Sequence, residues 1–124
     1  MNSKVSLVIR ILLAAFVLLF GINKFAHFMS FPPVPGDGGV LMGVYVTSGF
    51  FSLIGVLEII AGLALLAGKF IPIALTVIIA IMVNAVIFHV LHDPATVMGA
   101  IIGLVLGLVL VFGYKDKFGT FLNA

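Results

Sequence analysis

The sequence predicts an all-α integral membrane protein in which residues 1–124 form a single domain, an antiparallel four-helix bundle. Of the 124 residues, 64% are hydrophobic and 8% are charged, and the mean hydropathy is +1.44. A soluble domain of this size needs many more polar residues to cover its surface. Four apolar segments are long enough to cross a bilayer, which takes about 20 residues. These expected spans are about 5–26, 46–67, 70–91 and 95–113.

The few polar residues exclude several classes of protein. Six basic residues are scattered along the chain and form no patch or stripe typical of nucleic-acid binding. There is no cysteine, which excludes disulfides and thiolate metal sites. We therefore expect the lipid bilayer as the main partner and no nucleic acid.

The first segment could also be a signal peptide, since Lys4 and Arg10 precede the apolar run ILLAAFVLLFG. No small-x-small cleavage site follows, and the chain continues as INKFAHFMSF, so we expect a retained first helix.

Glycine and proline indicate where the later helices begin and end. Gly68 is suited to end the second span and Pro72 to begin the third, which leaves a tight turn and an antiparallel hairpin. Asp93 and Pro94 are suited to the N-cap and the first position of the fourth span.

Basic residues predict the orientation in the membrane. An even number of spans places both termini on one side, together with five of the six basic residues. These are Lys4, Arg10, Lys69, Lys115 and Lys117. The positive-inside rule makes this side cytoplasmic, so we expect a multi-pass protein of the plasma membrane, the inner membrane of a bacterium. The outer loop, 27–45, should lie on the bilayer surface or fold back onto the bundle.

Small residues mark the helix faces that should pack together. The stripe on the first span consists of Arg10, Ala14, Val17, Gly21 and Lys24. The stripe on the second consists of Ser48, Phe51, Gly55, Glu58, Gly62 and Leu65. On the fourth span, Gly99, Gly103 and Gly107 repeat at four-residue spacing. Such small residues let neighbouring backbones approach closely.

A buried carboxylate is the most informative polar feature, because an unpaired ionised residue at the bilayer centre costs about 2.5–3.5 kcal/mol. Glu58 should therefore point toward a partner helix. Heights estimated from the rise per residue favour Arg10 as its partner and Asn84 as a neutral second partner. Lys24 is farther away, near the outer boundary. We take Arg10, Lys24, Glu58 and Asn84 as the candidate ligand-binding or buried polar cluster. It is either a structural pair or a site that also holds a ligand or a proton.

Three histidines form a second group at the outer boundary. His27 ends the first span, and His89 and His92 end the third. Clustered imidazoles could bind a metal or a haem, or respond to pH. Interfacial histidines also act as plain polar anchors, and this pair lacks the fixed partner spacing of metal motifs. We therefore assign no metal site.

The stretch RILLAAFVLLFGINKFAHF resembles the opening of DoxX-like membrane proteins, where an arginine precedes an apolar helix ending in a G-x-x-K-[FL] pattern. EIIAGLALLAGKFIPIALTVIIAIMVNAVIFHVLHD is similar to the family's second segment, E-x-x-x-G-L-x-L-x-x-G followed by a helix ending near histidine. The resemblance covers roughly 5–115 and implies four helices with short cytoplasmic turns. The recurring positions of the pattern fall on Arg10, Gly21, Lys24, Glu58, Gly62, Gly68, Asn84 and His89.

The resemblance also implies a function. DoxX-like proteins are associated with membrane redox processes, as thiosulfate:quinone oxidoreductase subunits or as partners of detoxifying enzymes. We expect an accessory subunit of a quinone-linked or other membrane redox system. Because the chain has no cysteine and no flavin or nucleotide fingerprint, a quinone cofactor or a redox enzyme partner would carry the electrons. Two alternatives stay open: a structural or assembly partner without a ligand, such as a homo-oligomer, and a small solute or proton carrier.

Overall fold

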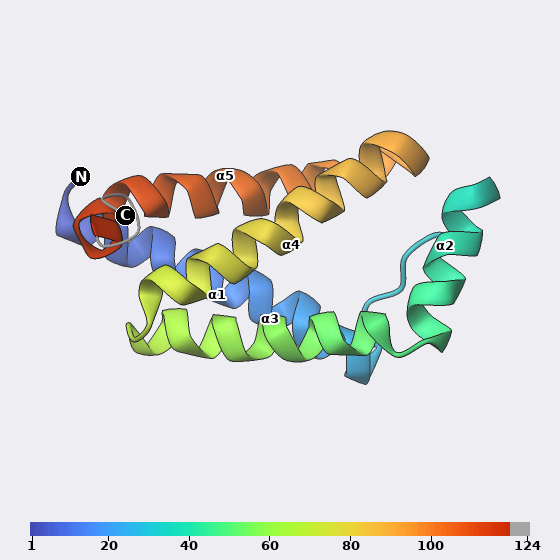
Figure 1. The fold of residues 1–124 in the computed structure, drawn as a ribbon, viewed down its shortest axis with the longest axis horizontal. Coiled ribbons are helices and arrows are strands. Elements are labelled where there is room, and N and C mark those ends of the chain that lie inside the picture. Colours follow the sequence, from blue (N-terminus) through green and yellow to red (C-terminus); the bar gives the residue numbers. More distant parts are fainter. Residues whose placement is uncertain (120–124) are drawn as a thin grey trace.

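The computed structural model describes residues 1–119, and within them every regular element is helical (Figure 1). The α-helices are α1 (Ser3–Ala26), α2 (Gly36–Thr47), α3 (Phe50–Ala67), α4 (Ile71–His92) and α5 (Met98–Gly113). Two short 3₁₀ helices, η1 (Pro94–Thr96) and η2 (Lys115–Phe118), flank α5. The predicted all-α fold class is confirmed for this part of the chain.

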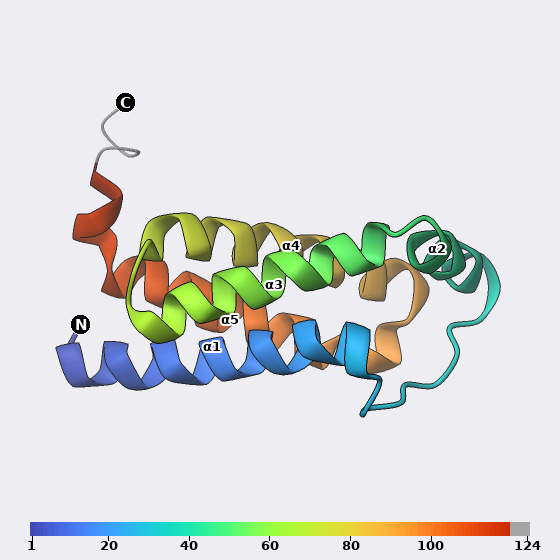
Figure 2. The same ribbon diagram turned by 90° about the horizontal axis from the view of Figure 1, so that it is seen from below.

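Four of the helices lie lengthwise beside one another, and α2 crosses one end of the molecule (Figures 1 and 2). The main packing partners are α1 with α3 and α4 with α5, and α3 and α4 are joined by a tight turn. The start of α1, the α3–α4 turn and the end of α5 lie at the same end, opposite α2 (Figure 1).

Three of the four expected spans are long and apolar enough to cross a membrane. They are α1, α3 and α4, with 24, 18 and 22 residues. The fourth, α5, is equally apolar in character but has only 16 residues. At about 1.5 Å per residue it is roughly 24 Å long, less than the usual hydrocarbon thickness of about 30 Å.

The expected boundaries are confirmed at the α3–α4 turn and corrected before α5. Gly68 ends α3 in the left-handed conformation, with φ of 73°, and Pro72 lies in the first turn of α4. Asp93 does not cap the fourth long helix, because η1 intervenes and α5 begins only at Met98. The side chain of Asp93 instead accepts a 2.6 Å hydrogen bond from the hydroxyl of Thr96.

The expected outer loop, 27–45, contains a helix that the sequence did not predict. Four glycines within α2 give it low intrinsic helix propensity, so its sequence resembles a loop. Tertiary contacts favour the helix. A Cβ atom on Gly38 would lie 2.6 Å from the Cβ of His92, and the ring of Tyr45 stacks on Phe50 at 5.4 Å. In consequence α3 begins at Phe50 and not near residue 46.

The core lies between the four lengthwise helices. Its fully buried side chains come from all four: Leu13, Val17, Leu65, Leu75, Ile78 and Leu110. Many large apolar side chains on the same helices face outward, among them Leu12, Ile60, Ile73 and Phe112. An apolar exterior around a packed apolar core is consistent with a membrane protein.

Candidate functional site

Glu58 points into the interface between α3 and α1, as its position on the small-residue stripe predicted. Its side chain is 3% exposed. A Cβ atom on Gly55 would lie 3.2 Å from Lys24, and one on Gly62 would lie 2.7 Å from Leu18. The two glycines therefore allow α1 to pass close to α3 on both sides of the carboxylate.

The partner of Glu58 is Lys24 of α1. The Nζ atom of Lys24 lies 2.6 Å from Oε1 of Glu58, and the lysine side chain is 12% exposed. The same Nζ atom lies 4.8 Å from the centre of the Phe51 ring, within cation–π distance. Two opposite charges and an aromatic face thus form a closed contact between α1 and α3, which we call the Lys24–Glu58 pair.

Arg10 does not reach Glu58, which corrects the pairing expected from the sequence. Its Nη1 atom donates to the hydroxyl of Tyr114 at 3.3 Å, and a Cβ atom on Gly68 would lie 3.0 Å from it. Arg10 is therefore level with the end of α3, and Glu58 is level with Gly21, about 16 Å farther along α1. The sequence-based heights assumed that the two helix ends were level, whereas α1 extends beyond α3.

Asn84 does not reach Glu58 either. It is exposed on α4, and within residues 1–119 its side chain makes no hydrogen bond. Asn84 follows the buried Ile78 by six residues, and at about 100° per residue this turns it about 120° away from the core. The expectation used only the position of Asn84 along the axis of α4. It did not include the direction in which the side chain points around that axis.

The three histidines lie at the α2 end of the molecule but have separate surroundings. His27 ends α1 in the left-handed conformation and is exposed. The Nδ1 atom of His89 lies 3.0 Å from Oγ1 of Thr96, and the ring of His92 lies 5.3 Å from that of Phe88. In the described part of the chain, no three histidine, cysteine, aspartate or glutamate side chains converge as metal ligands would. His89 thus makes a polar contact, and His92 packs against an aromatic ring.

Asn23 is a buried polar residue that the sequence analysis missed. Its Oδ1 atom accepts a 2.7 Å hydrogen bond from the backbone N–H of Met29, and its Nδ2 atom donates to the Met29 carbonyl at 3.3 Å. Asn23 therefore fixes the chain as it leaves α1. The available signal was an amide in the last turn of an apolar helix. Tyr114, the partner of Arg10, was also missed, although a tyrosine at the end of a span is typical of an interfacial anchor.

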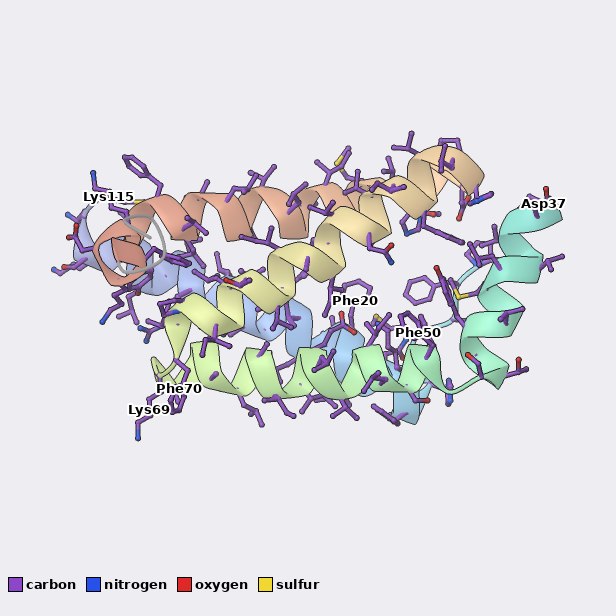
Figure 3. The ribbon with its side chains drawn as sticks, viewed as in Figure 1. Phe20, Asp37, Phe50, Lys69, Phe70 and Lys115 are labelled. Atoms are coloured by element: carbon purple, nitrogen blue, oxygen red, sulfur yellow. The ribbon has the colours of Figure 1, made fainter. Side chains whose placement is uncertain are left out.

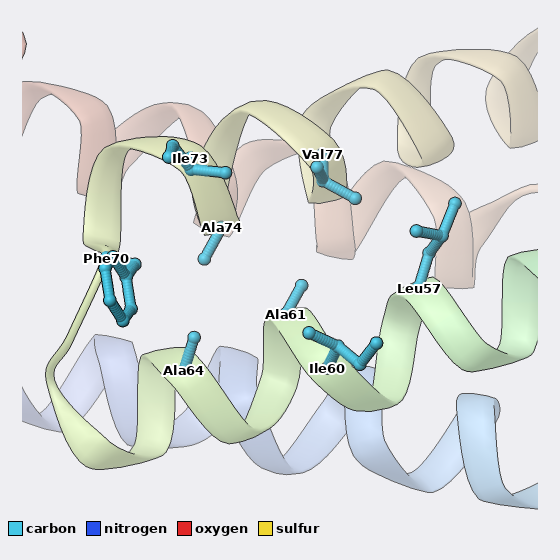
Figure 4. A pocket seen from close by; sticks show the side chains of 8 residues that line it. All are labelled: Leu57, Ile60, Ala61, Ala64, Phe70, Ile73, Ala74 and Val77. Carbon is cyan, nitrogen blue, oxygen red and sulfur yellow. The ribbon is translucent and has the colours of Figure 1, made fainter.

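An apolar groove runs between α3 and α4 (Figure 4). It has a volume of about 300 Å³. Its lining residues are Leu57, Ile60, Ala61, Ala64, Phe70, Ile73, Ala74 and Val77. None of these side chains can donate a hydrogen bond, and Glu58 is not among them. The groove is therefore separate in its chemistry from the Lys24–Glu58 pair.

Neither the groove lining nor the Lys24–Glu58 pair offers a free hydrogen-bond donor to a quinone headgroup. A quinone carbonyl needs a hydrogen-bond donor, and the groove residues supply none. The Lys24 ammonium group is already engaged by Glu58 and the Phe51 ring inside a closed interface.

Comparison of the chain with family models, with curated proteins and with solved structures gives no match. The resemblance to DoxX-like proteins therefore stays a prediction, carried by the residues that suggested it.

Proposed function

We propose that α1, α3, α4 and α5 form an antiparallel four-helix bundle across the plasma membrane of a bacterium, with both termini in the cytoplasm. Three of these helices have the length and hydropathy of spans. Lys69 and Lys115 lie at the end where α1 begins, and Asp37 lies at the opposite end (Figure 3). The cationic end is the cytoplasmic end by the positive-inside rule.

Within this topology, the protein acts as a non-catalytic accessory subunit that assembles with other membrane proteins. The supporting observation is that its one intramembrane ion pair among the described residues is closed by mutual contact. By joining α1 to α3, the Lys24–Glu58 pair sets the relative position of the two helices. It thereby sets the shape of the lipid-facing surface that a partner recognises. By the DoxX-like resemblance, the partner is a membrane redox enzyme, which carries the electrons itself.

The topology can be tested with single cysteines, because the natural sequence has none. Asp37→Cys should react with a membrane-impermeant maleimide in intact cells, and Lys69→Cys should react only after lysis. The reverse labelling pattern would contradict the cytoplasmic placement of the termini.

The accessory role can be tested by deletion and by purification from native membranes. Deletion should lower the assembled amount of a membrane redox enzyme, and that enzyme should co-purify with the tagged chain after cross-linking. Glu58→Gln should lower the amount of folded chain and of assembled partner in parallel. If the Glu58→Gln protein folds as well as the natural one but no longer supports the partner's activity, Glu58 takes part in chemistry and the proposal fails.

A further inference from the structure

No group within residues 1–119 pairs with the exposed amide of Asn84, which on the proposed topology lies in a part of α4 without water. This inference rests on the proposed membrane topology. Asn84 lies eight residues before the end of α4 at His92, about 12 Å along the helix axis. At that depth neither water nor lipid headgroups satisfy an amide, and no side chain or backbone group within residues 1–119 does so.

Asn84 lies on the side of α4 that faces the groove. Val77 lines the groove, and Asn84 follows it by seven residues, about two helical turns, which places both on nearly the same face. Ala80 lies between them and is also exposed. The amide therefore lies beyond the end of the apolar groove between α3 and α4, toward His92.

Small side chains line part of the groove. In Figure 4 the side chains of Ala61, Ala64 and Ala74 point into the space between α3 and α4. Small residues of this kind allow a neighbouring helix to approach, and in a bilayer such packing is what holds helices together. The groove carries no charge, so its occupant is apolar.

We propose that a second copy of this chain occupies the groove, with the two Asn84 amides hydrogen-bonded across a twofold axis. An asparagine both donates through Nδ2 and accepts through Oδ1, so it is complementary to its own copy. A twofold axis places the same patch of both copies face to face. A lipid acyl chain could fill the groove, but it would leave the amide without a partner.

Dimerisation is measured by energy transfer between labelled copies in liposomes over a range of protein-to-lipid ratios. Asn84→Leu removes the donor and the acceptor, and should weaken dimerisation roughly 3- to 30-fold, the range for interhelical hydrogen bonds in membranes. Asn84→Gln keeps the amide and should retain most of the affinity. Val105→Leu, on the exposed side of α5, is the matched surface control and should change nothing.

Cross-linking locates the surface. Ala80→Cys should form a disulfide between copies on oxidation, and adding Asn84→Leu should suppress it. Val105→Cys should not cross-link. A wild-type chain that stays monomeric, an Asn84→Leu variant that dimerises as well as wild type, or equal cross-linking from both cysteines would each overturn the proposed dimer.

Carbonate extraction of the same variants separates the two proposals. Chains that remain in the membrane but do not dimerise refute only the Asn84 surface. Chains that are released into the soluble fraction refute the membrane topology itself.

Discussion

A Cβ atom added to Gly21 would lie 3.0 Å from the Cβ of Glu58 and 3.1 Å from the carbonyl oxygen of Gly55. The backbone of α1 therefore passes directly against α3 at the level of the carboxylate. This contact fixes how closely the two helices approach, and through it whether Lys24 can reach Glu58.

Replacing Gly21 by leucine should separate α1 from α3. Overpacking of this kind costs about 1–3 kcal/mol, and the loss should appear in the free energy of unfolding measured by denaturant titration in mixed micelles. Gly99→Leu is the control, because nothing lies within 4 Å of a Cβ atom at Gly99. Equal stability of the two variants would contradict the close approach.

The Lys24–Glu58 pair should behave as one unit in a double-mutant cycle. Glu58→Gln and Lys24→Met each leave one charge without its partner in a buried interface, at a cost of about 3–5 kcal/mol. The double substitution removes both charges and should recover at least half of the summed loss of unfolding free energy. Full additivity would mean that the two groups do not stabilise the fold together.

Arg10 provides a matched comparison for that cycle. Because Arg10 contacts Tyr114 and is far from Glu58, the effects of Arg10→Gln and Glu58→Gln should add to within about 0.5 kcal/mol. An interaction free energy larger than about 1 kcal/mol between Arg10 and Glu58 would instead support the pairing that the sequence predicted.

Asn23→Ala should free the segment that follows α1. It removes both hydrogen bonds to Met29 and leaves its part-buried backbone N–H and C=O without these partners, which costs about 1 kcal/mol. Hydrogen exchange at the Met29 amide should accelerate while exchange in the middle of α1 changes little. Asn84→Ala in dilute detergent is the control and should leave monomer stability unchanged. Unaltered exchange at Met29 would show that other contacts hold this segment.

Gly68→Ala should destabilise the protein more than Gly49→Ala. Both glycines have positive φ, 73° and 84°, so both alanines carry a backbone penalty of about 1–2 kcal/mol. Only at Gly68 would the new Cβ atom also meet the Arg10 guanidinium, at 3.0 Å from Nη1. The difference between the two thermal midpoints measures that added contact. A larger loss at Gly49 would contradict it.

Periodicity predicted the face of a helix better than it predicted the partner on that face. The stripe containing Glu58 placed it inward, because small residues at three- and four-residue spacing distinguish one side of α3 from the other. The identity of its partner depended on how far α1 is shifted along its axis relative to α3. The residues within the two spans do not indicate that shift. Lys24 belongs to the predicted polar cluster, but its estimated height near the boundary disfavours it as the partner; the offset of α1 against α3 brings it to Glu58.

Asn84 and α2 could not be predicted for a different reason. The α4 helix is apolar on all sides, so its sequence does not indicate which side faces the core. The α2 helix is rich in glycine, so its own sequence does not favour a helix. It forms through contacts with His92, which is far away in sequence, and with Phe50, which follows the end of α2. Both features depend on tertiary packing, which local patterns do not contain.

The unequal lengths of α1 and α5 have a consequence for the surrounding lipid. Helices of 24 and 16 residues differ by about 12 Å in axial extent. On the proposed topology, acyl chains beside α5 must compress or tilt while those beside α1 stay extended, at a modest elastic cost. A bilayer of uniform thickness cannot match both helices, so on this topology the membrane would be thinner beside α5 than beside α1.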